Sequence, residues 1–156
     1  MLVTWTVSVW LVWLARFHAN ALCIFQSENE EKAAFAIDRR MKFIEDNLID
    51  PWCRLEREEW KTKEGTVGKF QYRHNASTVW GVPQGGAVIR GYTFSAMVMD
   101  ESEFQREGAS ALTAALPIVE NGAKLVILSS SNGPSGILAE ICAAVGIRTL
   151  RNWVKR

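Results

Sequence analysis

Two adjacent carboxylates, Asp100 and Glu101, are the residues of this chain best placed to do chemistry. They directly follow an apolar run, residues 94–99, whose length and content of Phe and Val are typical of a strand buried on both faces. Parallel sheets place functional groups at the carboxyl ends of their strands, which is where this pair falls. One acid can support Mg²⁺ there, and the other can polarise an attacking water. The structural alternative is that both acids open a helix, whose macrodipole favours negative charge in its first turn.

A second polar cluster follows the next apolar run, residues 124–128, which also predicts a buried strand. The cluster consists of Ser129, Ser130, Ser131 and Asn132. Two neighbouring parallel strands would bring this cluster and the acidic pair to the same edge of a sheet. Hydroxyls and an amide beside two carboxylates can sense a γ-phosphate and pass its presence on as a loop shift. The alternative is a turn-rich loop, because Ser, Asn, Gly and Pro dominate turns.

The elements that would position these groups alternate between helices and strands. Residues 2–18 predict a helix that is apolar on all sides and therefore buried, and residues 21–26 predict a strand. Ser27 is expected to cap the next helix, with Glu30 three residues later forming a capping box. Residues 109–119 and 136–145 predict two further helices. This order is typical of an α/β layered domain.

The middle of the chain, about residues 52–90, has a different character. Residues 55–60, 67–72 and 78–82 predict short antiparallel strands inserted between the parallel units, because Gly, Asn and Pro residues separate them. Trp52, Trp60 and Trp80 are expected to pack beneath these strands, since tryptophan usually buries its ring. The alternative is an aromatic platform on which nucleic-acid bases stack.

Composition sets further limits. The chain has 156 residues, enough for one domain with a core, and its 18 basic and 17 acidic residues give no bulk charge that favours nucleic acid or membrane. Cys23, Cys53 and Cys142 are odd in number and lack a CxxC pairing, so they predict reduced thiols in a cytosolic protein. His18 and His74 do not have a zinc-ligand spacing and are expected at the surface or hydrogen-bonded.

The apolar segment of residues 2–15 could also be mistaken for a signal peptide or a membrane anchor. It has no basic region before it and no small-residue cleavage pattern, and Arg16 ends it short of the roughly 20 residues that a spanning helix needs. A buried core helix is therefore favoured. A small membrane-anchored protein stays open as an alternative.

Taken in order, these motifs resemble those of the large terminase subunit of tailed bacteriophages, the DNA-packaging motor. Residues 26–33 resemble the segment after that family's second strand, and Arg90-Gly91 with residues 97–101 resembles its run into the Walker B motif. Residues 128–134 resemble its coupling motif. The resemblance spans nearly the whole chain. It implies a P-loop NTPase-like (ASCE-type) α/β domain with a mainly parallel central sheet and an inserted antiparallel β-meander.

The resemblance also implies roles for individual residues. Asp100 would support Mg²⁺ through water, and Glu101 would orient or activate the water that hydrolyses ATP. The cluster of residues 129–132 would couple the γ-phosphate state to motion along DNA. Arg90 is a candidate arginine finger acting on a neighbouring subunit's nucleotide; the alternative is a charge that ends a strand.

Partners and location follow from the same resemblance. The implied cofactors are ATP and Mg²⁺, and the implied partners are double-stranded DNA, the portal protein and the small terminase subunit. The full-length protein would form a homo-oligomeric ring in the cytoplasm of the bacterial host, at the procapsid portal, with no membrane involved.

Two departures from the family pattern change the expected activity. The sequence contains no G-x-x-x-x-G-K-[ST] loop, because its only Gly-Lys pair, Gly68-Lys69, is followed by Phe70. The family's loop precedes the helix that corresponds to residues 2–18, and its RNase-H-like nuclease domain usually follows the ATPase. We therefore expect residues 1–156 to be a truncated ATPase domain, without the first strand, the P-loop and the nuclease domain, that turns over little or no ATP. The alternative is a non-catalytic remnant that binds the portal or other terminase subunits.

Overall fold

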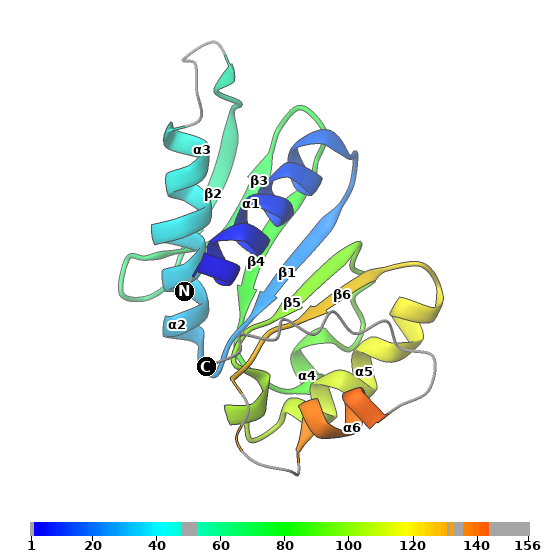
Figure 1. The fold of residues 1–156 in the computed structure, drawn as a ribbon. Helices are drawn as coiled ribbons and strands as arrows, with labels where there is room; N and C mark the ends of the chain where they lie inside the picture. Colours follow the sequence, from blue (N-terminus) through cyan, green and yellow to red (C-terminus); the bar gives the residue numbers. More distant parts are fainter. Residues whose placement is uncertain (1, 48–52, 131, 133–135, 144–156) are drawn as a thin grey trace.

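The computed structural model describes residues 2–47, 53–130, 132 and 136–143 (Figure 1). These residues contain a six-stranded sheet with the strand order β2-β3-β4-β1-β5-β6. Strands β4, β1, β5 and β6 run parallel, whereas β2 and β3 extend the sheet in antiparallel fashion. The predicted α/β class with a mainly parallel sheet is confirmed. The strands are β1 (Leu22–Gln26), β2 (Arg57–Lys61), β3 (Val67–Tyr72), β4 (Thr78–Val82), β5 (Ala96–Met99) and β6 (Lys124–Ile127).

Helices cover the two faces of the sheet unequally. On one face lie α1 (Leu2–Phe17) and a continuous helical rod made of α2 (Glu30–Ala36), the π-helix η1 (Ile37–Lys42) and α3 (Phe43–Asn47). On the other face lie α4 (Gly86–Ile89) and α5 (Gly108–Glu120), which cover the half of the sheet around β5 and β6. The short 3₁₀ segment η3 (Ser102–Phe104) and α6 (Ile137–Ala143) follow the tips of β5 and β6.

The sheet separates two hydrophobic cores. Side chains of β1 alternate between them, because Phe25 points toward α1 and the rod whereas Ile24 points toward α4 and α5. This arrangement explains why the sequence of β1 is apolar at almost every position. Gly81 lets the rod approach β4 closely, since a Cβ there would lie 2.8 Å from Ile37 Cγ1 and 2.9 Å from the Ala33 carbonyl oxygen.

Two sequence predictions about the helices are wrong. α1 buries one face only, and Leu2 is 85% exposed, because the sheet contacts this helix from a single side. The rod is capped by Asn29 rather than Ser27: Asn29 Oδ1 accepts a hydrogen bond from Lys32 N at 2.8 Å, and Ser27 is buried at the end of β1. Among the described helices, none combines the length and apolar character required to cross a bilayer.

The predicted antiparallel meander is confirmed, but the expected burial of Trp60 is wrong. β3 pairs antiparallel with β2 and β4, and β4 also pairs in parallel with β1, which joins the meander to the parallel strands. Trp60 is 43% exposed and Trp80 is half-buried, because α4 and α5 do not extend over β2 and β3. Trp52 lies outside the described residues.

The described cysteines are free thiols and the described histidines lie at the surface, as predicted. Cys23 is buried, which raises the pKa of its thiol to about 12, and Cys53 is exposed. Both are free thiols. His18 and His74 are exposed, and His74 Nε2 lies 3.0 Å from the Arg16 carbonyl oxygen. The side chain of Cys142 lies outside the described residues.

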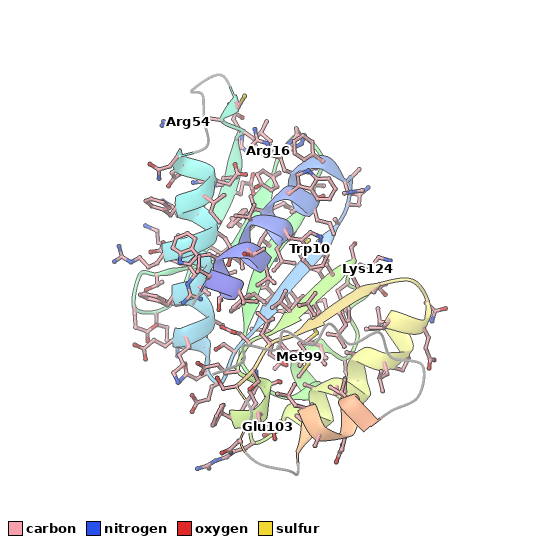
Figure 2. The ribbon with its side chains drawn as sticks, in the orientation of Figure 1. Trp10, Arg16, Arg54, Met99, Glu103 and Lys124 are labelled. Carbon is pink, nitrogen blue, oxygen red and sulfur yellow. The ribbon has the colours of Figure 1, made fainter. Side chains whose placement is uncertain are left out.

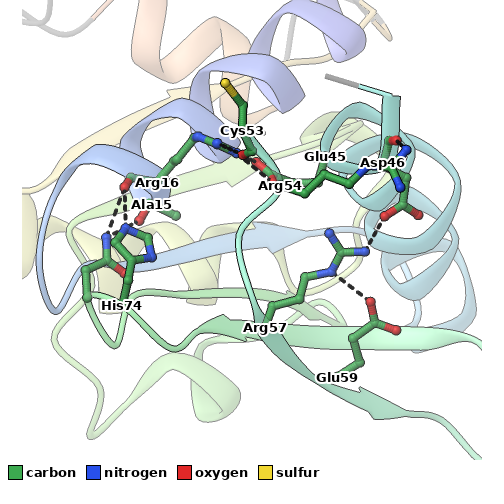
Figure 3. A network of polar contacts seen from close by, with 10 residues as sticks. Ala15, Arg16, Glu45, Asp46, Cys53, Arg54, Arg57, Glu59 and His74 are labelled. Carbon is green, nitrogen blue, oxygen red and sulfur yellow. Dashed lines mark hydrogen bonds and ion pairs between the residues drawn. The ribbon is translucent and has the colours of Figure 1, made fainter. Parts of the chain in front are cut away.

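A network of ion pairs joins α1, α3 and β2 near the amino ends of the parallel strands (Figure 3). Arg16 Nη1 contacts Glu45 Oε2 at 2.9 Å and Oε1 at 3.2 Å, and the Glu45 side chain is completely buried. Arg57 bonds the carboxylates of Asp46 and Glu59. These contacts hold the far end of the rod against the helix and strand beside it.

Candidate functional site

The tip of β5, which carries Asp100, is held between the tips of β1 and β6. Asp100 N donates to the Gln26 carbonyl oxygen at 2.9 Å, and Leu128 N donates to the Met99 carbonyl oxygen at 2.8 Å. Ser102 N donates back to the Leu128 carbonyl oxygen at 3.1 Å. The three carboxyl ends therefore share one edge of the sheet, as expected for parallel neighbours.

Glu101 adopts a left-handed backbone conformation, with φ 51° and ψ 42°. This region costs a residue with a Cβ roughly 1–2 kcal/mol relative to ordinary conformations. The unusual geometry turns the chain sharply from β5 into η3 and leaves the Glu101 side chain exposed. Strained residues of this kind concentrate at functional sites, which makes this position a candidate.

A cavity of about 550 Å³ opens beside Asp100 and Glu101. Its opposite wall is the polar face of the helical rod, which contributes three basic side chains, Lys32, Arg39 and Arg40. A volume of this size is typical of small-molecule sites. The remaining lining residues are Ser27, Asn29, Glu31, Phe35 and Thr66.

Charge in this cavity is only partly neutralised by the protein itself. Burial raises the pKa of the Asp100 carboxyl, while the nearby Arg40 guanidinium lowers it and the Glu101 carboxylate raises it again. Neither Asp100 nor Arg40 forms an ion pair with any other residue that the structure describes. Lys32 pairs with Glu28, and this contact raises the pKa of Lys32. The cavity thus offers a cationic wall opposite two carboxylates.

The serine cluster meets the acidic pair through one residue. Ser129 Oγ accepts a hydrogen bond at 3.1 Å from the backbone N–H of Glu103, in the turn that follows Asp100 and Glu101. Ser130 and Asn132 are exposed, and no hydrogen bond joins either side chain to that turn among the described contacts. Ser131 lies outside the described residues.

Glu103 is a connecting residue that sequence reasoning missed. Besides its N–H bond to Ser129, its carboxylate Oε2 accepts from Leu138 N at 3.0 Å, at the start of α6. A Cβ on Gly136 would lie 1.8 Å from Glu103 Oε1, so glycine is required for this contact. The turn after β5 is therefore hydrogen-bonded both to the tip of β6 and to α6.

Arg90 of the same chain is not among the residues that line this cavity. It follows the C-terminal end of α4, where its N–H donates to the Gly86 carbonyl oxygen at 3.0 Å, and its side chain is exposed. It precedes the amino end of β5, whereas Asp100 follows the carboxyl end. Its role as an arginine finger toward a neighbouring subunit stays a prediction.

The basic wall was also missed, although the sequence holds a signal for it. Lys32, Arg39 and Arg40 are spaced by seven and eight residues, which places them on one side of a helix. That side is opposite the apolar positions that identify the core face. What the sequence could not show is that this side faces the tip of β5 across a cavity.

Comparison with solved structures relates this fold to the large terminase from a thermophilic bacteriophage. The two align with a TM-score of 0.55 and 14% sequence identity, over 81% of this chain and 30% of that one. At this identity the likeness is one of fold. No protein-family model and no curated protein matches the sequence. The chain therefore has a terminase-like α/β fold and spans 30% of the length of the structure it matches.

Proposed function

We propose that this chain is part of a packaging-motor ATPase of the large-terminase type, in which Asp100 and Glu101 face the phosphates of ATP. The observation that carries the proposal is the meeting of Asp100, Glu101 and Ser129 at one sheet edge beside a cavity with a cationic wall. The fold likeness to a large terminase supports the same choice. Open α/β sheets generally bind their ligands at the carboxyl ends of their strands, and the proposed ATP site lies at such an edge.

The residues at the edge fit a magnesium–nucleotide complex chemically. Mg²⁺ takes hard oxygen ligands, usually one or two carboxylates together with waters and substrate phosphates. Asp100 offers a carboxylate and Ser27 a hydroxyl in the same lining, so they are the candidates to hold the ion. Bound Mg²⁺ would supply positive charge to the phosphate oxygens. Arg40 and Lys32 would attract the same phosphates from the opposite wall.

Glu101 and the turn after it would link water activation to movement. In the proposal, the exposed Glu101 carboxylate orients the attacking water, and a shift of its turn pulls on Ser129 and α6 through Glu103. The serine cluster would thus couple the nucleotide state to motion along double-stranded DNA. A ring of full-length subunits at the portal, assisted by the small terminase subunit in the host cytoplasm, is the proposed setting.

Turnover by this chain alone is expected to be little or none. The sequence has no P-loop motif, so loop amides, a lysine and a Mg²⁺-binding hydroxyl do not cradle the phosphates. Each missing charge-assisted bond is worth about 1.5–3 kcal/mol. Robust phosphate release by the purified chain, abolished in Glu101→Gln, would contradict this expectation while supporting the site.

A binding measurement tests the site directly. Mn²⁺ takes the same oxygen ligands as Mg²⁺, and protein-bound Mn²⁺ can be separated from free Mn²⁺ and from the Mn²⁺–ATP complex by rapid gel filtration. With ATP present, we expect weak Mn²⁺ uptake by the chain and about tenfold weaker uptake by Asp100→Asn, because one charged ligand is lost. The matched control is Glu56→Gln, which removes an exposed carboxylate on the far side of the molecule. Equal uptake by all three proteins, or uptake by none, would reject the site.

A non-catalytic interaction role is the second candidate, and an exposed apolar stripe on α1 favours it. Large apolar patches on a surface usually mark contact with another protein. Co-purification with the portal or a terminase subunit, unchanged in Asp100→Ala and weakened in Trp13→Ser, would support this role. The stripe consists of Leu2, Val9, Trp13 and Phe17, which helical spacing places on one side of α1.

A further inference from the structure

One half of the sheet has an uncovered face that carries aromatic rings around a lysine. α4 and α5 pack over β5 and β6, and β2 and β3 extend beyond them. A second cavity, of about 530 Å³, lies over this region. Trp60, Lys69 and Trp80 are direct cross-strand neighbours on β2, β3 and β4 and all line it.

The ammonium group of Lys69 sits between two indole rings. Its Nζ lies 4.9 Å from the centroid of the Trp60 ring and 5.7 Å from that of Trp80. Tyr92, which follows α4, meets Trp80 edge to face at 5.1 Å and 72°. Cation–π contacts of this kind hold the lysine in place without neutralising its charge.

Packing alone does not account for this arrangement. Cross-strand pairs of aromatic and long side chains stabilise sheets, so a Trp60–Lys69 contact has a structural role. However, Trp60 and Tyr92 remain 43% and 46% exposed at the rim of a cavity. The lining of this cavity contains two lysines, Lys61 and Lys69, and one carboxylate, that of Glu30, so its net formal charge is positive.

We propose that this surface, defined by Trp60, Lys69, Trp80 and Tyr92, binds single-stranded nucleic acid. Indole and phenol rings stack on the flat faces of bases, and a lysine between them attracts the linking phosphate. Lys69 occupies the space between the two indole rings, so a base would stack on a ring face that does not meet the lysine. Duplex DNA does not suit this surface, because its base faces are already stacked.

The surface is separate from the proposed ATP site, so each proposal can fail alone. Fluorescence anisotropy of a labelled oligo(dT) strand, measured with the purified chain at low salt, tests the proposed nucleic-acid surface. We expect measurable binding that weakens at high salt, and tighter binding of the strand than of its duplex or of thymidine monophosphate. Trp60→Ala should weaken binding about tenfold or more, since one stacking partner is lost.

Two further variants separate stacking from folding. Trp60→Phe keeps a ring and should retain most of the affinity, and Lys69→Gln should weaken binding and reduce its salt dependence. Phe43→Ala is the matched control, because it removes an exposed aromatic ring from α3 on the opposite layer. Unchanged circular dichroism would show that each variant is folded. No binding of the strand, preference for duplex, or equal loss in Trp60→Ala and Phe43→Ala would overturn the proposal.

Discussion

Charged residues gather at both ends of the sheet, and the two groups differ in how they are partnered. At the amino ends, Arg16 binds the buried Glu45, and Arg57 binds Asp46 and Glu59 (Figure 3). At the carboxyl ends, Asp100 and Arg40 face a cavity without an ion pair among the described residues. Figure 2 shows the separation, with Arg16 and Arg54 at one end and Met99 and Glu103 at the other.

This difference teaches how to distinguish charges that support the fold from charges that await a ligand. Taking a charge out of water is costly, so a structural charge is found together with its partner. A charge that faces an open cavity keeps contact with water and can pair with a ligand that enters. The amino-end group should therefore control the free energy of unfolding, and the carboxyl-end group should control binding.

The largest expected effect is on the amino-end group. Glu45→Ala leaves the guanidinium of Arg16, only 11% exposed, without its carboxylate, and should lower the free energy of unfolding by about 3–5 kcal/mol. Urea unfolding followed by tryptophan fluorescence measures this. Glu56→Ala, which removes an exposed partner 3.9 Å from Arg73, should change stability by less than about 0.5 kcal/mol. Similar losses of unfolding free energy in Glu45→Ala and Glu56→Ala would contradict the structural role assigned to the amino-end group.

The next effect is on binding at the carboxyl-end group. Arg40→Ala should weaken ATP-dependent Mn²⁺ uptake about tenfold, because a charge-assisted contact to phosphate is lost. Its unfolding free energy should stay within about 0.5 kcal/mol of the original. Arg39→Ala should have a smaller effect on uptake, since the Arg39 side chain is 70% exposed and pairs with Asp38. A stability loss in Arg40→Ala without a change in uptake would place this arginine with the structural charges.

A third, smaller effect concerns backbone strain at Glu101. Glu101→Gly removes the Cβ from a left-handed residue and should raise the free energy of unfolding by about 1 kcal/mol. Thermal unfolding detects such a gain. Glu103→Gly, next but one along the turn, should instead destabilise the protein, because it loses the contact with Leu138 N. If Glu101→Gly is also destabilising, the left-handed conformation is not a source of strain.

The smallest effect is a pH dependence at Asp100. Burial raises the pKa of this carboxyl in the folded protein above its unfolded value, so the folded state holds the proton more tightly. Stability from this group is therefore lost as pH rises from the unfolded pKa, about 3.9, through the raised folded pKa. Asp100→Asn should be slightly more stable than the original protein at neutral pH and should lose that advantage below about pH 4. An advantage that persists in acid would contradict this cause.

The elements of the fold could be predicted because their signals are local. The apolar runs before Asp100 and Ser129 became neighbouring strands, and the predicted helix of residues 109–119 became α5. Where two local signals competed, the prediction failed. Ser27 and Asn29 both suit an N-cap, and the choice was made by the length of β1, which extends to Gln26 and buries Ser27.

The candidate site could be predicted in part, for a related reason. Parallel pairing alone brings Asp100 and Ser129 together, and that pairing follows from the pattern of strands. The basic wall of Arg40 and Lys32 depends on how the rod lies across the sheet, and Gly81 determines that approach. Exposure of Trp60 depends on where α4 and α5 stop. Neither the course of the rod nor the ends of α4 and α5 can be deduced from the residues that are adjacent in sequence to these side chains.

The helical rod contributes side chains to both charged groups. Arg40 lies within η1, and Glu45 follows one turn later in α3. A π segment bonds each residue to the fifth one along rather than the fourth, so it holds an extra residue in the same length of helix. Removing that extra residue would return the segment to regular α-helix without turning the two ends of the rod relative to each other. The local widening of the helix thus lets the rod hold one extra residue between its ligand-facing and its anchoring side chains while both keep their orientation.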